Sequence, residues 1–183
     1  PSEPLEMKIT IQGGVGTSEE HDFLLKNYNA DSVGWGSPFL LVPEATSVDA
    51  ETRNLLAQSK KEDFYLSHIS PLGVPFNTVK GTSNEMFKNQ KTAKNKFGSS
   101  CPKKLLALNK EYSTEGMCTA SKKFQEIKLN ELELQKHEFT NVQFEKKGKE
   151  IKDKSCLCVG LVNAAYIENN LPVKGEKHGV VVC

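Results

Sequence analysis

The sequence predicts an α/β fold, with a βαβ segment and its following helix in residues 1–60 and a loop-rich, mainly helical extension in residues 61–183. Three observations support this prediction. Two short runs suited to β-strands lie near the start, each followed by a glycine-rich turn, and a capped helical segment separates them. Longer segments with helical periodicity follow. All five cysteines lie in the second part.

The first strand is expected over residues 8–12, where apolar and polar β-branched side chains alternate. Three glycines follow, which turn the backbone sharply and leave no Cβ in the way of a ligand: Gly13, Gly14 and Gly16. Thr17 and Glu20 have the spacing of a capping box, so a helix should begin there. Its buried face is expected to hold Phe23, Leu24 and Tyr28.

A second strand is expected over residues 31–33, directly before Gly34 and Gly36. A right-handed crossover through the helix would pair the two strands in parallel, so the two glycine turns would lie side by side. The N–H groups and positive end of the helix would face the first turn, which suits a phosphate. In a TIM-type barrel, the loops after strands seven and eight form such a site.

The motifs GGVGT (13–17) and DSVGWGSPFLLVPEA (31–45) resemble the closing quarter of flavin-dependent, phosphate-binding TIM barrels, including the nitronate monooxygenase-like and glutamate synthase-like groups. The resemblance covers about the first quarter of the chain. It implies the C-terminal part of a TIM-type barrel, FMN as cofactor and a small-molecule substrate for the full-length protein. The implied cofactor-binding residues are Gly13, Gly14, Val15, Gly16, Gly34, Trp35, Gly36 and Ser37.

A complete barrel has eight strands, and this chain supplies sequence for the last two. We therefore expect a fragment that is inactive alone, an interpretation consistent with a start at Pro1 and an interrupted final strand at residues 179–183. Its exposed strand edges suggest self-association. A Rossmann fold is disfavoured because the first turn departs from G-x-G-x-x-G and lacks a well-placed acidic residue downstream.

Composition is that of an ordinary globular domain, with 26% charged residues and a net charge of +1. A lysine-rich stretch is interpreted as a solvated helix face and a mobile loop, with no nucleic-acid partner: Lys88, Lys91, Lys94, Lys96, Lys103 and Lys104. No apolar run is long enough to span a bilayer, and no signal peptide is recognisable, so we expect a cytoplasmic protein without membrane contact.

A helix capped by Asp49 is expected over residues 47–59. Residues 63–83 contain prolines and glycines without helical period, which favours an ordered loop of functional importance. His68 is the catalytic candidate in this loop, with a half-buried structural histidine as the alternative. Other side chains of the loop that could reach a ligand, or simply form turns, are Ser70, Asn77, Lys80 and Thr82.

Four cysteines have the spacing C-x16-C-x37-C-x-C: Cys101, Cys118, Cys156 and Cys158. In a cytoplasmic chain, clustered thiols point to metal or chemistry before disulfides. A C-x-C pair can ligate one iron–sulfur cluster or zinc ion, and Cys–Pro is common beside cluster ligands. Because the chain has no C-x-x-C pair, the alternative of small buried thiols stays open for Cys118 and Cys158.

Three more helices are expected over residues 120–134, 141–154 and 157–169. Segments of this second part also resemble a bacterial family without a firmly assigned activity: SPLGVPFNTVKGTS, CPKKLLALNKEYSTEGMCTASKKFQ and KSCLCVGLVNAA. The leading hypothesis is an FMN-dependent oxidoreductase of unknown substrate. Two alternatives remain, a non-catalytic structural region and a module that binds zinc or an iron–sulfur cluster through cysteines.

Overall fold

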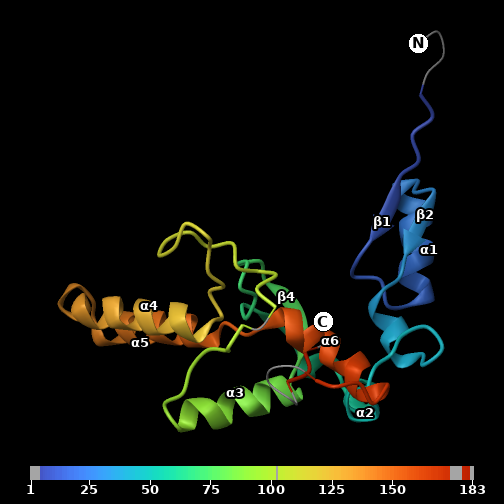
Figure 1. Cartoon of the computed structure of the whole chain (residues 1–183). Coiled ribbons are helices and arrows are strands. Elements are labelled where there is room, and N and C mark those ends of the chain that lie inside the picture. The colour runs from blue at the N-terminus through green and yellow to red at the C-terminus, as the bar shows by residue number, and fades with distance from the viewer. Residues whose placement is uncertain (1–4, 102, 174–178, 182–183) are drawn as a thin grey trace. The chain divides into compact units, whose positions relative to one another are not determined.

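The computed structural model describes residues 5–101, 103–173 and 179–181, and its chain divides into two units, Pro1–Ser47 and Val48–Cys183 (Figure 1). The described residues form a mixed α/β structure with six α-helices and two two-stranded sheets. The division lies before the helix that starts at Ala50, whereas the sequence had placed a boundary after it, at residue 60. This helix therefore belongs to the second unit.

The first unit is a parallel βαβ arrangement. Strand β1 (Thr10–Gln12) pairs in parallel with β2 (Ser32–Gly34), and helix α1 (Ser18–Tyr28) connects them. A short 3-10 helix, η1 (Ser37–Leu41), follows β2. Both the parallel pairing and the Thr17–Glu20 capping box agree with the sequence prediction. A TIM-type barrel remains a prediction, because the described residues contain one parallel strand pair.

The prediction that α1 has a buried face is wrong. No residue of α1 is buried: Phe23 is 53% exposed and Tyr28 is 62% exposed, while Leu24 is half-buried. The rings of Phe23 and Tyr28 contact each other edge-on, with centroids 6.0 Å apart. The physical reason is that two strands of three residues each are too narrow to cover the apolar side of a three-turn helix.

The second unit begins with α2 (Ala50–Gln58), where the Asp49 side chain accepts a hydrogen bond from the Thr52 N–H at 3.0 Å, as predicted. After a 3-10 turn, η2 (Lys61–Asp63), strands β3 (Phe64–Ser67) and β4 (Phe76–Val79) form an antiparallel hairpin. The prediction of a loop without regular structure over residues 63–83 is therefore wrong. Each strand has only four residues, and the eight residues between them, 68–75, are not a two-residue hairpin turn, so no short-range hairpin signal marks the pair in the sequence.

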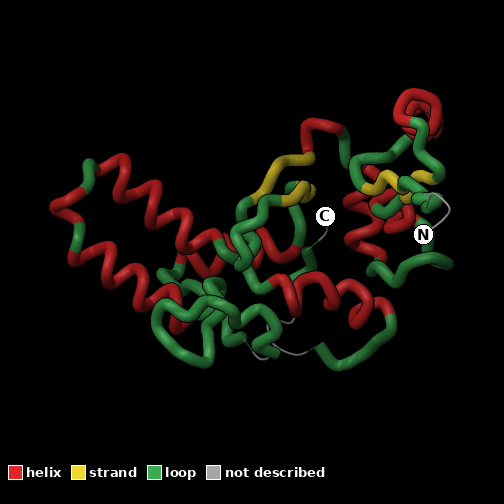
Figure 2. Tube along the Cα trace, turned by 90° about the horizontal axis from the view of Figure 1, so that it is seen from above, coloured by secondary structure: helices red, strands yellow, loops and turns green. Residues whose placement is uncertain are grey.

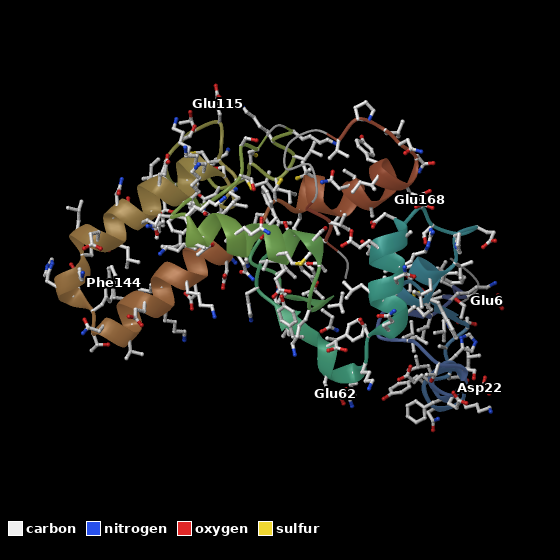
Figure 3. All side chains as sticks on the ribbon, turned by 90° about the horizontal axis from the view of Figure 1, so that it is seen from below. Glu6, Asp22, Glu62, Glu115, Phe144 and Glu168 are labelled. Atoms are coloured by element: carbon white, nitrogen blue, oxygen red, sulfur yellow. The ribbon has the colours of Figure 1, made fainter. Side chains whose placement is uncertain are left out.

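Four further helices complete the second unit: α3 (Ser83–Ala93), α4 (Lys122–Leu134), α5 (Asn141–Asp153) and α6 (Leu157–Glu168). The last three match the predicted helices to within two residues at each end. Helices α4 and α5 lie side by side as a hairpin, joined through the 3-10 turn η3 (Lys136–Glu138) (Figures 1 and 2). Phe144 lies near the turn end of this hairpin (Figure 3).

In the lysine-rich stretch, Lys94, Lys96 and Lys104 are exposed as predicted, whereas two lysines on α3 are held by other parts of the chain. Lys88 on α3 forms an ion pair with Asp153 at 3.3 Å, and its side chain is 23% exposed. Lys91 donates to the Gly98 carbonyl at 2.5 Å. Both lysines therefore fasten α3 to other parts of the second unit.

Buried side chains of the second unit form its core, and one cluster joins Ile69, Leu157 and Val181. Gly160 on α6 permits the close approach of Val181, because a Cβ there would lie 2.7 Å from the Val181 Cγ2. Residues 179–181 form no strand, and the remainder of the predicted final strand lies outside the described residues. At the other end of α6, Glu168 pairs with Arg53 of α2 at 3.1 Å (Figure 3).

Candidate functional site

Two glycine loops leave the same edge of the β1–β2 pair. Gln12 lies opposite Gly34 in the parallel register, so the loop over residues 13–16 and the loop over residues 34–37 both start at the carboxyl ends of the strands. This geometry brings together the residues that the sequence assigned to a phosphate site: Gly13, Gly14, Val15, Gly16, Gly34, Trp35, Gly36 and Ser37. Open α/β folds bind ligands at this edge.

The first loop presents bare backbone. Gly13 and Gly14 have φ of +93° and +71°, a region that favours glycine, and nothing lies within 4 Å of the position that a Cβ would take. Val15 is buried, with 6% of its surface exposed, and anchors the loop. Among the described residues, no protein group accepts a hydrogen bond from the N–H of Gly13, Gly14 or Val15. An anion would not have to displace a protein acceptor from these three donors.

The helix N-terminus itself is already occupied by a carboxylate. Glu20 Oε2 accepts hydrogen bonds from the N–H of Gly16 at 2.8 Å and of Thr17 at 3.1 Å. These backbone hydrogen bonds, Gly16 first, lower the pKa of Glu20 and keep it ionised. An incoming phosphate would therefore meet the donors of residues 13–15 first. The sequence predicted the cap at Thr17 and Glu20, but not this competition with a ligand.

The second loop is fixed to α1 by a residue that sequence reasoning missed. The Trp35 Nε1–H donates to His21 Nδ1 at 3.0 Å, and the two ring centroids lie 5.9 Å apart. His21 stands four residues after Thr17, one turn further along α1, and this spacing is the signal that could have indicated it. Gly34 lies close to Gln12, whose Cγ would be 2.9 Å from an added Cβ.

The candidates around the β3–β4 loop are explained mainly by local structure. His68 is exposed, and its carbonyl accepts a hydrogen bond from Lys154 Nζ at 2.7 Å. No described residue forms a hydrogen bond or ion pair with its imidazole, so the catalytic assignment gains no partner from the structure.

The other four candidates lie in turns, caps and strands. Ser70 Oγ accepts from the Leu72 N–H at 3.2 Å, which shapes a turn. Thr82 caps α3, and Lys80 Nζ donates to the Glu62 carbonyl at 2.7 Å. Asn77 is exposed on β4.

The four predicted metal-ligand cysteines all belong to the second unit. Cys118 is buried, with 4% exposed, and Cys101, Cys156 and Cys158 are half-buried. Burial, and then the charges of the other three thiols, raise the pKa of Cys118 to about 11. Within the described ranges, no group of three His, Cys, Asp or Glu side chains stands at a spacing that could hold a single metal ion.

No family model, curated protein or solved structure matches the chain. Across the part of the chain that the structure describes, none of the helices combines the length and the apolar character needed to cross a membrane.

Proposed function

We propose that the first unit grips the phosphate of FMN in a flavin-dependent oxidoreductase of unknown substrate. The supporting observation is the parallel β1–α1–β2 arrangement, whose two glycine loops leave one edge while three N–H groups of the first loop have no described acceptor. Bound FMN would supply the redox chemistry, exchanging electrons with the substrate. The chain's own residues bind and orient the phosphate.

The N–H groups of Gly13, Gly14 and Val15 would donate to phosphate oxygens. Charge-assisted hydrogen bonds of this kind are roughly twice as strong as neutral ones. The hydrogen bond between Trp35 and His21 holds the second loop in place, so the backbone of Gly36 and Ser37 would complete the grip with little reordering. The ionised Glu20 carboxylate opposes the ligand's charge and would tune its affinity.

The proposal assigns only the phosphate grip to this parallel strand pair. A TIM-type barrel contains eight parallel strands. Contacts to the flavin ring, the substrate and a catalytic base would therefore come from other strands of the protein. His68 is not needed for the grip.

The deciding experiment compares FMN with riboflavin, which lacks the phosphate. The protein that carries this chain is titrated with each compound, and quenching of the fluorescence of Trp35 is followed. Trp35 is the one tryptophan in this sequence. We expect FMN to bind about 10- to 100-fold more tightly, the value of one or two hydrogen bonds to a charged group. Inorganic phosphate should compete with FMN.

A matched pair of glycine variants separates binding from folding. Gly14 and Gly73 have φ of +71° and +77°, and both have open space around the Cβ position, but Gly73 lies in the β3–β4 loop. Gly14→Ala should weaken FMN binding, while Gly73→Ala should leave it unchanged. Equal affinities for FMN and riboflavin, or no flavin binding, would contradict the proposal and favour a purely structural role for the glycines.

A further inference from the structure

One pocket of the second unit, which we name the lysine pocket, is lined by five lysines: Lys88, Lys91, Lys96, Lys152 and Lys154. These lysines come from α3, from the loop that follows it and from the C-terminal end of α5 (Figure 1). No aspartate or glutamate of the described ranges is among the residues that line the pocket. Positive charge is therefore concentrated at one point where two helices end.

Contacts within the unit hold two of these ammonium groups in place. Lys152 Nζ lies 4.6 Å from the centroid of the Phe97 ring, which also lines the pocket. Lys154 Nζ donates to the His68 carbonyl at 2.7 Å. Because an ammonium group has three N–H donors, these contacts position the two lysines and leave each of them donors for a ligand.

The negative charge near the pocket does not balance the lysines. Asp153 forms an ion pair with Lys88 at 3.3 Å, and the C-terminal ends of α3 and α5 together amount to about one further negative charge. Even when Lys91 is left out of the count, the four other lysines exceed these two negative charges by about two. Among the described residues, no carboxylate forms an ion pair with the remaining three lysines: Lys96, Lys152 and Lys154.

Two neutral side chains add hydrogen-bonding groups to the same pocket. Asn84 and Ser99 both line it, and each has only 7% of its surface exposed. The Asn84 amide and the Ser99 hydroxyl form no hydrogen bond with a described residue. Burying a polar side chain without a partner is costly, and buried polar groups in proteins are nearly always hydrogen-bonded. These two side chains therefore indicate a ligand independently of the lysines.

The size of the lysine pocket restricts the ligand. Its volume is about 20 Å³, roughly the space that one or two water molecules occupy. Such a space admits the oxygen atoms of an anion but no ring or chain of an organic molecule. The part of a ligand that is recognised must therefore be compact, negatively charged and rich in hydrogen-bond acceptors.

We propose that the lysine pocket binds a phosphate group, either as inorganic phosphate or as the monoester of a small molecule whose organic part stays outside. A phosphate monoester carries a charge of about −1.5 to −2 near pH 7, which matches the surplus of about two positive charges. Its oxygens accept hydrogen bonds from ammonium, amide and hydroxyl donors. This inference does not depend on flavin binding by the first unit, because all the lining residues belong to the second.

The first test is acetylation of the lysines in the unaltered full chain, with and without inorganic phosphate, read out residue by residue by mass spectrometry. A bound phosphate favours the charged, unreactive form of a neighbouring amine. Acetylation of Lys96 and Lys152 should slow by about tenfold, the effect of raising an amine pKa by about one unit. Lys94 and Lys149 are exposed, lie close by in sequence and do not line the pocket, so their rates should stay the same.

Two further anions identify the form of the ligand. Protection by methyl phosphate as well as inorganic phosphate would support a monoester, and protection by inorganic phosphate alone would support the free ion. Sodium acetate at the same ionic strength should give no protection, because a carboxylate carries one charge and two oxygens. Equal protection by acetate, or protection by none of the three anions, would overturn the proposal.

Matched lysine variants then measure the contribution of single charges by calorimetric titration of the full chain with phosphate. Lys152→Gln should weaken binding by about tenfold, the value of one hydrogen bond to a charged group. Lys96→Gln removes an exposed charge and should weaken it by about two- to fivefold. Lys149→Gln and Lys94→Gln are the respective controls and should bind as the wild type does. Equal affinity of all four variants would contradict the assignment.

The lysine pocket and the glycine loops can be tested separately. Gly14→Ala should leave the protection of Lys152 by phosphate unchanged, and Lys152→Gln should leave the titration of Trp35 with FMN unchanged. FMN binding without protection of the lysines would overturn the lysine pocket alone. Protection of the lysines without FMN binding would overturn the flavin proposal alone.

Discussion

The two units are stabilised in different ways. Among the described residues of the first unit, Val15 alone is buried, and the unit is held by the capping box, a three-residue strand ladder and the Trp35–His21 hydrogen bond. The second unit buries an apolar core and the polar side chains of Gln125 and Asn163. Burial of apolar surface is the main source of folding stability. The first unit has little of it, so its fold depends on its helix cap and its hydrogen bonds.

The strongest test of this contrast uses the same substitution in each unit. Phe124 on α4 is 6% exposed, whereas Phe23 on α1 is 53% exposed. We expect Phe124→Ala to lower the free energy of unfolding by about 3–5 kcal/mol, because it removes a buried ring and leaves a cavity. Phe23→Ala should change it by less than about 0.5 kcal/mol. Urea unfolding measures both values.

Two optical probes assign each effect to its unit. Trp35 lies in the first unit, so its fluorescence reports that unit, while far-ultraviolet circular dichroism is dominated by the helices α2 to α6 of the second. A large effect of Phe23→Ala on the Trp35 transition would mean that a partner or a second copy covers α1. Such a result would support the self-association expected from the sequence.

The second prediction concerns the buried amide of Gln125, which connects two segments of the second unit, one around Thr119 and one around Lys154. Gln125→Met keeps the shape of the side chain but removes the donor to the Lys154 and Thr119 carbonyls. Leaving these acceptors without that donor should cost about 1–3 kcal/mol, reduced by the removal of the Gln125 Oε1, which has no described partner. Circular dichroism in urea measures the loss. Unchanged stability would show that the amide does not hold the segments together.

The same difference between the units explains what sequence could predict. The caps at Thr17 and Asp49 and the helical periodicities are local signals, and the structure contains the corresponding helices. The hairpin of β3 and β4 pairs across the eight-residue loop 68–75, and Gln125 donates to the carbonyl of Lys154, 29 residues away. No local pattern indicates such partners.

The candidate site shows the same limit. Glycine spacing and the parallel crossover predicted two neighbouring loops, and the structure contains them. Periodicity also indicated the apolar side of α1, but it could not show that this short unit lacks the surface to bury it. Where the four cysteines lie relative to one another is a tertiary property, since 16 and 37 residues separate the first three of them.

The third prediction compares the N-caps of two helices, one in each unit. Thr17 caps α1 and Thr140 caps α5, each within a complete capping box. Thr17→Ala and Thr140→Ala should each cost about 1 kcal/mol, because one helix-terminal N–H loses its acceptor. The midpoint of thermal unfolding should fall further for Thr17→Ala, followed by Trp35 fluorescence, than for Thr140→Ala, followed by circular dichroism. The reason is that the first unit has less buried surface to offset the loss. Equal shifts would indicate that the two units unfold together.

The smallest effect expected is a pH dependence confined to the first unit. Hydrogen bonds from Gly16 and Thr17 lower the pKa of Glu20 below its ordinary value of 4.5. A carboxyl group whose pKa is lower in the folded state contributes stability that is complete above the unfolded pKa and is lost as the pH falls through the folded pKa. The Trp35 transition should therefore weaken on acidification below about pH 4.5.

Glu20→Gln isolates this contribution, because the other carboxylates titrate in both proteins. The variant should show a smaller decrease of the Trp35 unfolding midpoint on acidification than the wild type, and a matched Glu19→Gln variant should behave as the wild type does. Glu19 has no hydrogen bond to a described residue. At neutral pH, Glu20→Gln should also strengthen FMN binding, since it removes a negative charge beside the proposed phosphate. Weaker binding by this variant would mean that the carboxylate organises the loop more than it repels the ligand.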